Sequence, residues 1–216
     1  ILQPSGKRKR KFSEKYRREK RKKGNPMIKT TEKTHLAVLR ITVAAMFAAL
    51  NVAFSSFGVP VPGGHLYLND VVICTAAVLL DPFSAFFVGG VGAFLGDLFF
   101  YPAPMFVSLV THGLQAVVIS LFSRHVLKEH PVIASGLGVS VGAVIMVVGY
   151  SLGRAFIYST PEYAVIKLPF QILQAAVGAV LGMLIVWRFG VGDLFRGKGI
   201  TPPLPAKDGK KEEISK

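Results

Sequence analysis

The sequence predicts an all-α integral membrane protein with six transmembrane helices and both termini in the cytoplasm. Of its 216 residues, 51% are hydrophobic and 18% are charged, yet the net charge is +14. Soluble domains rarely combine so apolar a composition with so large a basic excess. The charges lie mostly at the ends: residues 1–26 hold 12 basic and 2 acidic side chains, whereas residues 27–189 hold 8 and 6. An apolar middle between basic ends excludes a soluble enzyme domain, a disulfide scaffold and a secreted module.

Four of the expected spans are continuous apolar stretches. Each reaches the length of about 20 residues that a helix needs to cross a hydrocarbon core of about 30 Å. They are Leu36–Phe57, Pro104–Phe122, Val132–Tyr158 and Ala164–Phe189.

The apolar stretch Val71–Phe100 is too long for one upright helix and contains Asp81-Pro82. Proline removes a backbone donor and disfavours helix in the residue before it, so we expect a turn there. The stretch then becomes two spans, Asn69–Leu80 and Phe83–Phe99. The first is short, so it must tilt, thin the bilayer or be shielded by its neighbours.

The basic residues favour six spans over five. With six spans and cytoplasmic termini, only Arg154 and Lys167 of the 26 basic residues lie in the outer half, as the positive-inside rule requires. Five spans would place the lysines of the C-terminal tail outside. The expected organisation is a basic tail over residues 1–35, a transmembrane domain over 36–189 and a polar tail over 190–216.

The basic run Lys7–Lys23 has two interpretations. Its composition is typical of nucleic-acid-binding segments and nuclear addresses. Because six spans follow it, we favour a solvated tail that reinforces the cytoplasmic orientation and contacts anionic membrane lipid. No nucleic-acid partner is expected.

Small residues repeat at helical spacing in two of the spans. In the first span, Ala44 and Ala48, and likewise Ala45 and Ala49, are four residues apart. Such faces let another helix approach closely, and that helix can belong to a partner or to the same chain. The glycines of Gly89–Gly96 in the third span indicate packing within the chain.

Polar side chains in the last three spans lie at similar depths. At about 1.5 Å per residue, His112, Tyr150 and Gln171 are roughly 10–14 Å below the outer surface. Gln115 and Gln174 lie one turn deeper on the same helix faces as His112 and Gln171.

Two charged residues, Asp97 and Arg154, also fall in the outer half, whereas the inner half is almost wholly apolar. A channel or proton relay would need polar groups through the full thickness, so the asymmetry favours a pocket that opens outward. Taken singly, each residue could instead form a helix–helix hydrogen bond, and Asp97 could form a structural ion pair with Arg154.

The loop between the first two spans, GVPVPGGHLYLND, is rich in proline and glycine and carries His65 and Asn69. We expect a lid over the pocket rather than a plain connector. His65 and His112 lack the further ligands that a metal site needs, and no cofactor is expected. No P-loop or hydrolase motif is present, so the chain is not expected to be an enzyme.

Three stretches that cover nearly all of residues 40–188 resemble a known family. They read AAMFAAL, GGHLYLNDVVICTAAVLLDPFSAFFVGGVGAFLGDL and VVGYSLGRAFIYSTPEYAVIKLPFQILQAAVGAVLG. They are similar to the substrate-binding S components of energy-coupling factor (ECF) vitamin transporters of the riboflavin or hydroxymethylpyrimidine type. The resemblance implies six helices and an outward pocket. It also implies that the alanine face of the first helix docks on a transmembrane coupling protein, which works with two ATPase subunits.

Two departures from the family pattern bear on the ligand. The resemblance implies an acidic residue where Arg154 stands and asparagine where Gln171 stands. Arginine grips carboxylates and phosphates, which would suit pantothenate or a phosphorylated vitamin. If Asp97 neutralises Arg154, a neutral ligand such as pyridoxine or hydroxymethylpyrimidine remains open. The rival functions are a self-sufficient secondary transporter and a membrane scaffold without ligand.

Overall fold

The computed structural model describes residues 26–127 and 129–197. The chain divides into two compact units, Ile1–Leu39 and Arg40–Lys216. The described part of the first unit is the beginning of helix α2 (Pro26–Ser55), and the remaining elements belong to the second. The basic run Lys7–Lys23 and most of the predicted C-terminal tail lie outside the described residues.

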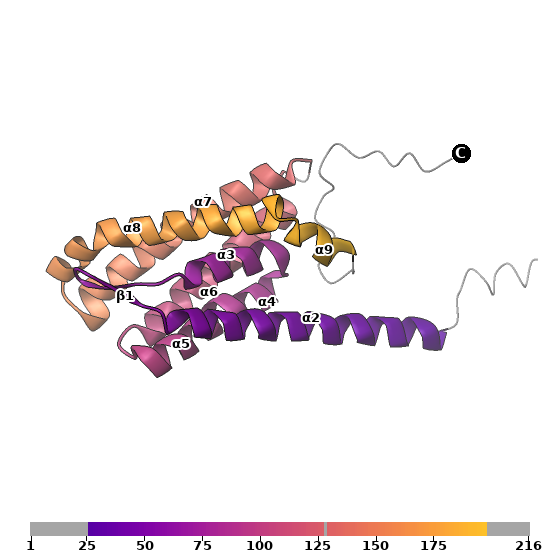
Figure 1. The fold of residues 1–216 in the computed structure, drawn as a ribbon, viewed down its shortest axis with the longest axis horizontal. Helices are drawn as coiled ribbons and strands as arrows, with labels where there is room; N and C mark the ends of the chain where they lie inside the picture. The colour runs from indigo at the N-terminus through magenta and orange to yellow at the C-terminus, as the bar shows by residue number, and fades with distance from the viewer. Residues whose placement is uncertain (1–25, 128, 198–216) are drawn as a thin grey trace, which may run out of the picture. The chain divides into compact units, whose positions relative to one another are not determined.

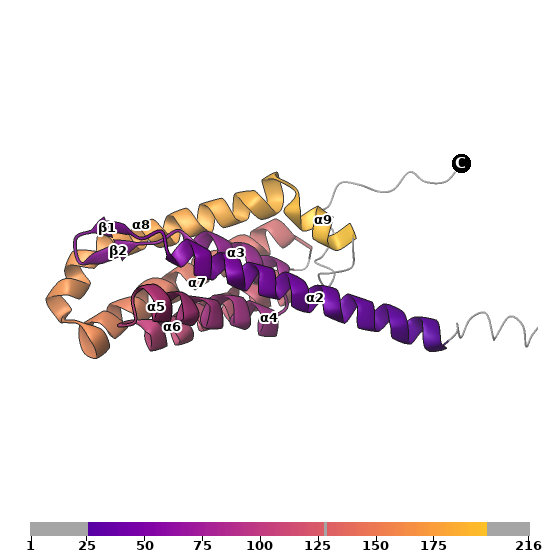
Figure 2. The same ribbon diagram turned by 60° about the horizontal axis from the view of Figure 1, so that its bottom comes forward.

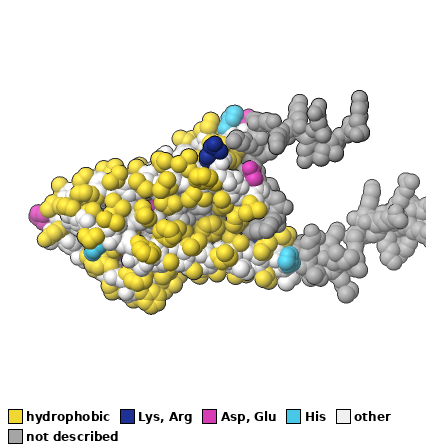
Figure 3. All heavy atoms as spheres, viewed as in Figure 1, with side chains coloured by type: hydrophobic (Ala, Val, Ile, Leu, Met, Phe, Trp, Pro, Cys, Tyr) yellow, Lys and Arg dark blue, Asp and Glu magenta, His cyan; other side chains and the backbone are white. Residues whose placement is uncertain are grey.

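Within the described residues, five helical stretches have the length and hydropathy of membrane spans. Their ends differ from the predicted ones by three residues or fewer. They are Thr34–Ser55, Pro82–Phe100, Met105–His125, Pro131–Tyr158 and Pro161–Arg188. Hydrophobic side chains cover the middle of the face seen in Figure 3, and the charged side chains visible there lie toward its ends.

Three of these spans contain a π-helical turn. The second joins α4 (Pro82–Phe86), η1 (Phe87–Val91) and α5 (Gly92–Phe100). The third is helix α6 (Met105–His125), which has no such turn. The fourth joins α7 (Pro131–Gly153) to η2 (Arg154–Tyr158), and the fifth joins α8 (Pro161–Met183) to η3 (Leu184–Arg188). Such turns often occur at functional sites, and η2 begins at Arg154.

The short second span of the prediction is helix α3 (Asn69–Leu79), which has 11 residues and is almost wholly buried. At 1.5 Å per residue it extends only about 17 Å, too little to cross the hydrocarbon core alone. It packs between α8 and α6 (Figure 1). The neighbouring helices therefore shield α3, as one of the three options for a short span requires.

The predicted turn at Asp81-Pro82 is present. Asp81 caps α4: one carboxylate oxygen accepts from the Ser84 amide at 3.1 Å, and the other accepts from the Ser84 hydroxyl at 2.9 Å. Pro82 occupies the first turn of the helix, where its missing N–H leaves no hydrogen bond unmade. The turn follows α3 directly and separates it from α4.

The loop after α2 forms a small antiparallel hairpin of β1 (Val59–Val61) and β2 (Gly64–Leu66). Its turn places Gly63 at φ 81° and Gly64 at φ 145°, where residues with a side chain are strained. Figure 2 shows the hairpin beside the first turns of α8, in agreement with the contacts between β2 and α8. The all-α prediction thus missed this hairpin, although the loop was expected to be shaped.

The glycines of the second long span serve packing within the chain, as predicted. A Cβ on Gly89 would lie 2.7 Å from the His112 carbonyl oxygen, and one on Gly92 would lie 2.8 Å from the Asn51 amide nitrogen. Asn51 donates to the Val88 carbonyl at 2.7 Å across the same contact. Glycine therefore allows α2 and α6 to approach this span closely.

The two alanine faces of α2 differ in their surroundings. Ala44 is buried and Ala48 is half-buried, whereas Ala45 and Ala49 are exposed. The first face therefore packs within the chain, and the second is open. The predicted polar tail also begins with a short helix, α9 (Val191–Gly197), whose Phe195 ring lies 6.2 Å from that of Phe47.

Candidate functional site

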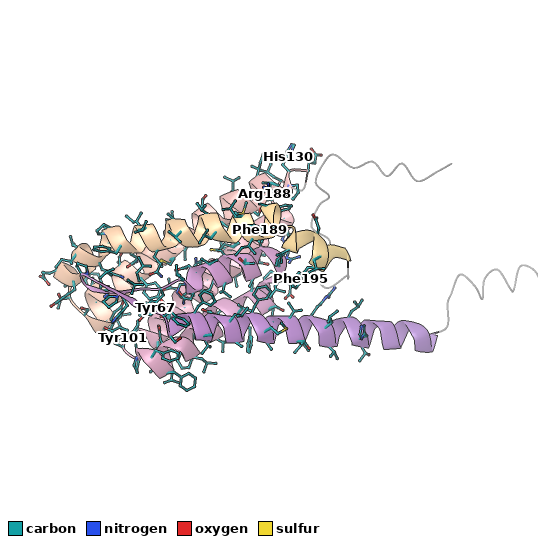
Figure 4. The ribbon with its side chains drawn as sticks, in the orientation of Figure 1. Tyr67, Tyr101, His130, Arg188, Phe189 and Phe195 are labelled. Atoms are coloured by element: carbon teal, nitrogen blue, oxygen red, sulfur yellow. The ribbon has the colours of Figure 1, made fainter. Side chains whose placement is uncertain are left out.

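A cavity lies beneath the β1–β2 hairpin, at the predicted outer end of the helices. Its empty volume is about 500 Å³, which includes space open to solvent at its mouth. Tyr67 and Tyr101 line it, and Figure 4 shows both at one end of the helices, with Arg188 and Phe189 at the other. Eight of the nine predicted site residues line this cavity: His65, Asn69, Asp97, His112, Tyr150, Arg154, Gln171 and Gln174.

Gln115, the ninth, lies behind the cavity wall and holds its neighbours in place. Its side-chain oxygen accepts from His112 Nδ1 at 2.7 Å, and its amide nitrogen donates to Asp70 Oδ1 at 3.2 Å. Since an amide oxygen only accepts, Nδ1 is the donor in this hydrogen bond. Gln115 therefore positions His112 rather than lining the cavity itself.

Asp70 connects two of the site's helices, although it was not among the predicted site residues. Gln174 donates to its Oδ2 at 2.6 Å, and His112 Nδ1 lies 3.7 Å from its Oδ1. Gln174 also accepts from the Tyr67 amide at 3.1 Å. Because Asp70 lies in the first turn of α3 and is buried, this network fixes the start of α3 between α6 and α8.

A second polar chain runs from Asp97 to His112. Ser108 donates a hydrogen bond to the Asp97 carboxylate and is hydrogen-bonded to the Tyr150 hydroxyl. The Tyr150 ring meets the His112 imidazole edge-on, with centroids 5.1 Å apart. Gln171 donates to the Val147 carbonyl of α7 at 2.7 Å, so α7 and α8 are joined at the same level.

Arg154 does not form the ion pair with Asp97 that the sequence had left open. Its Nη1 donates to the Gly63 carbonyl at 2.6 Å, and its guanidinium carbon lies 5.3 Å from the centroid of the Tyr158 ring. Among the described residues, none of the ion pairs joins Asp97 to Arg154. Within the described residues, the charge of Arg154 thus contacts a backbone oxygen and an aromatic face and forms no ion pair with a carboxylate.

Four further residues with polar side chains line the cavity and were not among the predicted site residues: Tyr67, Tyr101, Tyr158 and Lys167. The spacing could have revealed two of them, since Lys167 is one turn before Gln171 and Tyr158 one turn after Arg154. Tyr67 and Tyr101 lie outside the periodic helices, so no spacing marks them. Burial, aided by the Asp97 and Tyr101 charges, raises the pKa of Tyr67 to about 12, which keeps its hydroxyl a neutral donor.

Comparison with known proteins adds the decisive observation. A sequence model of the family described as "ECF-type riboflavin transporter, S component" matches residues 35–189, the stretch that contains every residue lining the cavity. The chain belongs to this family. It is therefore a multi-pass membrane protein and a transporter subunit, not an enzyme. Membership also decides against the secondary transporter and the scaffold without ligand.

This S component is also similar to a protein from Pyrococcus woesei described as "Uncharacterized protein in gap 3'region". The two are 33% identical over 126 residues, which cover 57% of this chain and 82% of the Pyrococcus protein.

In the described part of the chain, no group of three or more His, Cys, Asp or Glu residues is placed to hold a metal ion.

Proposed function

We propose that this S component captures a small water-soluble vitamin or vitamin precursor from outside the cell in the cavity beneath the β1–β2 hairpin. The supporting observation is that six buried side-chain atoms among the described residues lack a hydrogen-bond partner, and three of the six belong to residues that line the cavity. These three atoms are Asn69 Oδ1, Arg154 Nε and Tyr158 Oη. Buried polar groups are nearly always paired in folded proteins, so a ligand is the natural partner for all three.

Each predicted site residue has a role in this proposal. His65 and Asn69 belong to the lid segment and its junction with α3. His112, Tyr150, Gln171 and Gln174 form the polar floor and walls, and Gln115 orients His112 through the 2.7 Å hydrogen bond. Asp97 acts through Ser108, and Arg154 sets the charge preference.

We infer that six helices are embedded in the membrane, with α3 as the short sixth member and both termini in the cytoplasm. The burial of α3 among longer helices supports this count. The charge distribution supports the orientation, because Arg154 and Lys167 are the basic residues left in the outer half. Labelling of single cysteines placed in the hairpin and after α9 tests the topology. Outside-only labelling in the hairpin is expected, and outside labelling after α9 would contradict it.

The exposed face of α2 is the proposed contact with the ECF coupling protein, which works with two ATPase subunits. Ala45 and Ala49 are exposed and four residues apart, so they offer a surface on which another helix can pack closely. Ala49→Trp is expected to abolish co-purification with the coupling protein while ligand binding persists. Val180→Trp, at an exposed position of α8, is the matched control. Unchanged assembly of the Ala49 variant would overturn this contact.

Capture itself is tested by thermal-shift titration of the full chain in detergent with riboflavin, pyridoxine, hydroxymethylpyrimidine and pantothenate. A ligand that binds only the folded state raises its stability by mass action. Gln174→Ala, which removes the link between Tyr67 and Asp70, is expected to lose the shift. Ser140→Ala is the control, since Ser140 bonds only to the Gly136 carbonyl on the exposed side of α7. A shift that survives Gln174→Ala unchanged would place the ligand elsewhere.

A further inference from the structure

We infer that the ligand carries an anionic group, a carboxylate or a phosphate, which binds between Arg154 and Lys167. This inference rests on the proposed function, since it names the chemical class that the same cavity accepts. It follows from two buried cations that line the cavity without a carboxylate partner.

Arg154 is the first of these cations. Its side chain is only 8% exposed. A guanidinium has five N–H donors, yet the one hydrogen bond found for Arg154 runs from Nη1 to the Gly63 carbonyl, and Nε is buried without a partner. A buried cation with unused donors is costly to desolvate, and an anion would relieve that cost.

Lys167 is the second cation and is only 3% exposed. Its ammonium group has three donors, and the hydrogen bond found for it runs to the His65 carbonyl at 2.5 Å. The two cations flank the same turn: a Cβ on Gly64 would lie 3.4 Å from Arg154 Nη1, and one on Gly63 would lie 3.0 Å from Lys167 Cβ. They are close enough for their like charges to interact.

The nearby carboxylates already have other partners. Asp97 accepts from Ser108, and Asp70 accepts from Gln115 and Gln174. Asp70 Oδ1 lies 3.7 Å from His112 Nδ1, and no described carboxylate lies within 4.0 Å of either cation. A carboxylate or phosphate placed between Arg154 and Lys167 would therefore neutralise charges that the protein itself leaves uncompensated.

A second explanation for the two cations is a purely structural one, in which they only fasten the hairpin to the helices. Both hydrogen bonds do end on hairpin carbonyls, at Gly63 and His65. A neutral donor could make the same bonds without burying a charge, so fastening alone does not account for two cations. This explanation also predicts that ligand charge has no effect on affinity.

The test uses matched pairs of neutral and anionic probes on the full chain in detergent. The pairs are riboflavin and riboflavin 5′-phosphate, pyridoxine and pyridoxine 5′-phosphate, and panthenol and pantothenate. We expect the anionic member of at least one pair to bind roughly tenfold more tightly or better, the scale of hydrogen bonds to charged groups. Comparison of the two phosphate pairs with the carboxylate pair shows whether the site prefers a phosphate or a carboxylate.

Arg154→Gln and Lys167→Gln are each expected to remove most of the anion's advantage over its neutral counterpart, with both probes measured on the same variant. Arg154→Lys retains the charge and is expected to keep part of the tighter binding of the anionic probe. It replaces Arg154→Gln in the test if the glutamine variant does not fold. Added salt should weaken binding of the anionic probe and should not affect binding of its neutral counterpart.

The outcomes separate this inference from the proposed function. Equal or tighter binding of the neutral member in every pair that binds would overturn the anionic class and leave capture intact. An anion advantage that survives both glutamine variants would overturn the assignment to Arg154 and Lys167. Binding of none of the six probes would overturn capture in this cavity, and the inference with it.

Discussion

Two arginines at different ends of the transmembrane domain, Arg124 half-buried and Arg154 buried, show how the same residue type can serve two purposes. Arg124, in the last turn of α6, meets the C-terminal end of α3. Its Nη2 donates to the Leu79 carbonyl at 2.7 Å, and its Nε lies 3.2 Å from both the Leu80 carbonyl and the Ser120 hydroxyl. The carbonyls that end a helix lack partners within it and carry its negative pole, so Arg124 completes α3.

Arg154 lacks such a set of partners. It donates one hydrogen bond, to the Gly63 carbonyl of the hairpin that precedes α3, and it lines a cavity. Both side chains are charged, and Arg154 is the more buried of the two, yet it makes fewer hydrogen bonds than Arg124. The comparison indicates that the number of partners a buried cation has within the protein, rather than burial alone, separates a structural residue from a ligand-binding one.

The largest effect is expected at the structural arginine. Arg124→Ala leaves the Leu79 and Leu80 carbonyls without their cation, which should lower the free energy of unfolding by about 2–4 kcal/mol. Thermal unfolding in detergent measures this, and Arg124→Lys should recover part of the loss because it restores the charge. An Arg124→Ala variant as stable as the parent would remove the basis for the comparison.

Packing at the other end of α3 sharpens the comparison. A Cβ on Gly178 would lie 2.5 Å from Asp70 Cβ, so Gly178→Ala must displace the start of α3 and the Asp70 network. We expect a loss of about 1–3 kcal/mol together with weaker ligand binding. Gly136→Ala is the matched control, since its Cβ would meet only Met183 at 3.8 Å. Equal stability of the two alanine variants would show that α8 can shift away from α3 to accommodate the added methyl group.

At Arg154 we expect little effect on stability and a large one on binding. Arg154→Gln loses one hydrogen bond to a loop but also relieves an uncompensated buried charge, so the stability of the free protein should change by less than about 1 kcal/mol. Unfolding curves without ligand, compared with those of Arg124→Ala, measure the difference. A loss as large as at Arg124 would mean that both arginines are structural.

The smallest effect concerns the pH dependence near Arg124. Burial opposes ionisation of Asp81, but hydrogen bonds from Ser84 outweigh it, with help from the charge of Arg124, and lower the Asp81 pKa. A depressed folded pKa adds stability above the unfolded value of 3.8, and this stability is lost as the pH falls through the folded value. Because solvent screens this carboxylate, the contribution should stay below about 1 kcal/mol.

Melting temperatures measured from about pH 7 down to about pH 3 check this sign. The parent should lose more stability over that range than Asp81→Asn, which cannot titrate. A steeper loss in the asparagine variant would show that Asp81 is not stabilised in its charged form.

Much of the membrane architecture could be read directly from the sequence. Apolar length and the proline at position 82 located the helices to within a few residues, because hydrocarbon thickness and backbone chemistry act locally. The polar residues of the cavity could also be recognised. Side chains such as His112, Tyr150 and Gln171 are energetically costly within a membrane span, so their presence indicates a specific role. The topology of six embedded helices and the docking face at Ala45 and Ala49 remain predictions.

Only the tertiary structure decided which polar groups are partners. Spacing places Asp97 and Arg154 in the outer half, but it does not show that Asp97 bonds to Ser108 and Arg154 to a hairpin carbonyl. It likewise gives no sign that Asp70 joins Gln115 to Gln174 or that Lys167 reaches the same turn as Arg154. The physical reason is range: hydropathy and helix periodicity are properties of neighbours in the chain, whereas hydrogen bonds and ion pairs depend on which helix surfaces meet once the chain has packed.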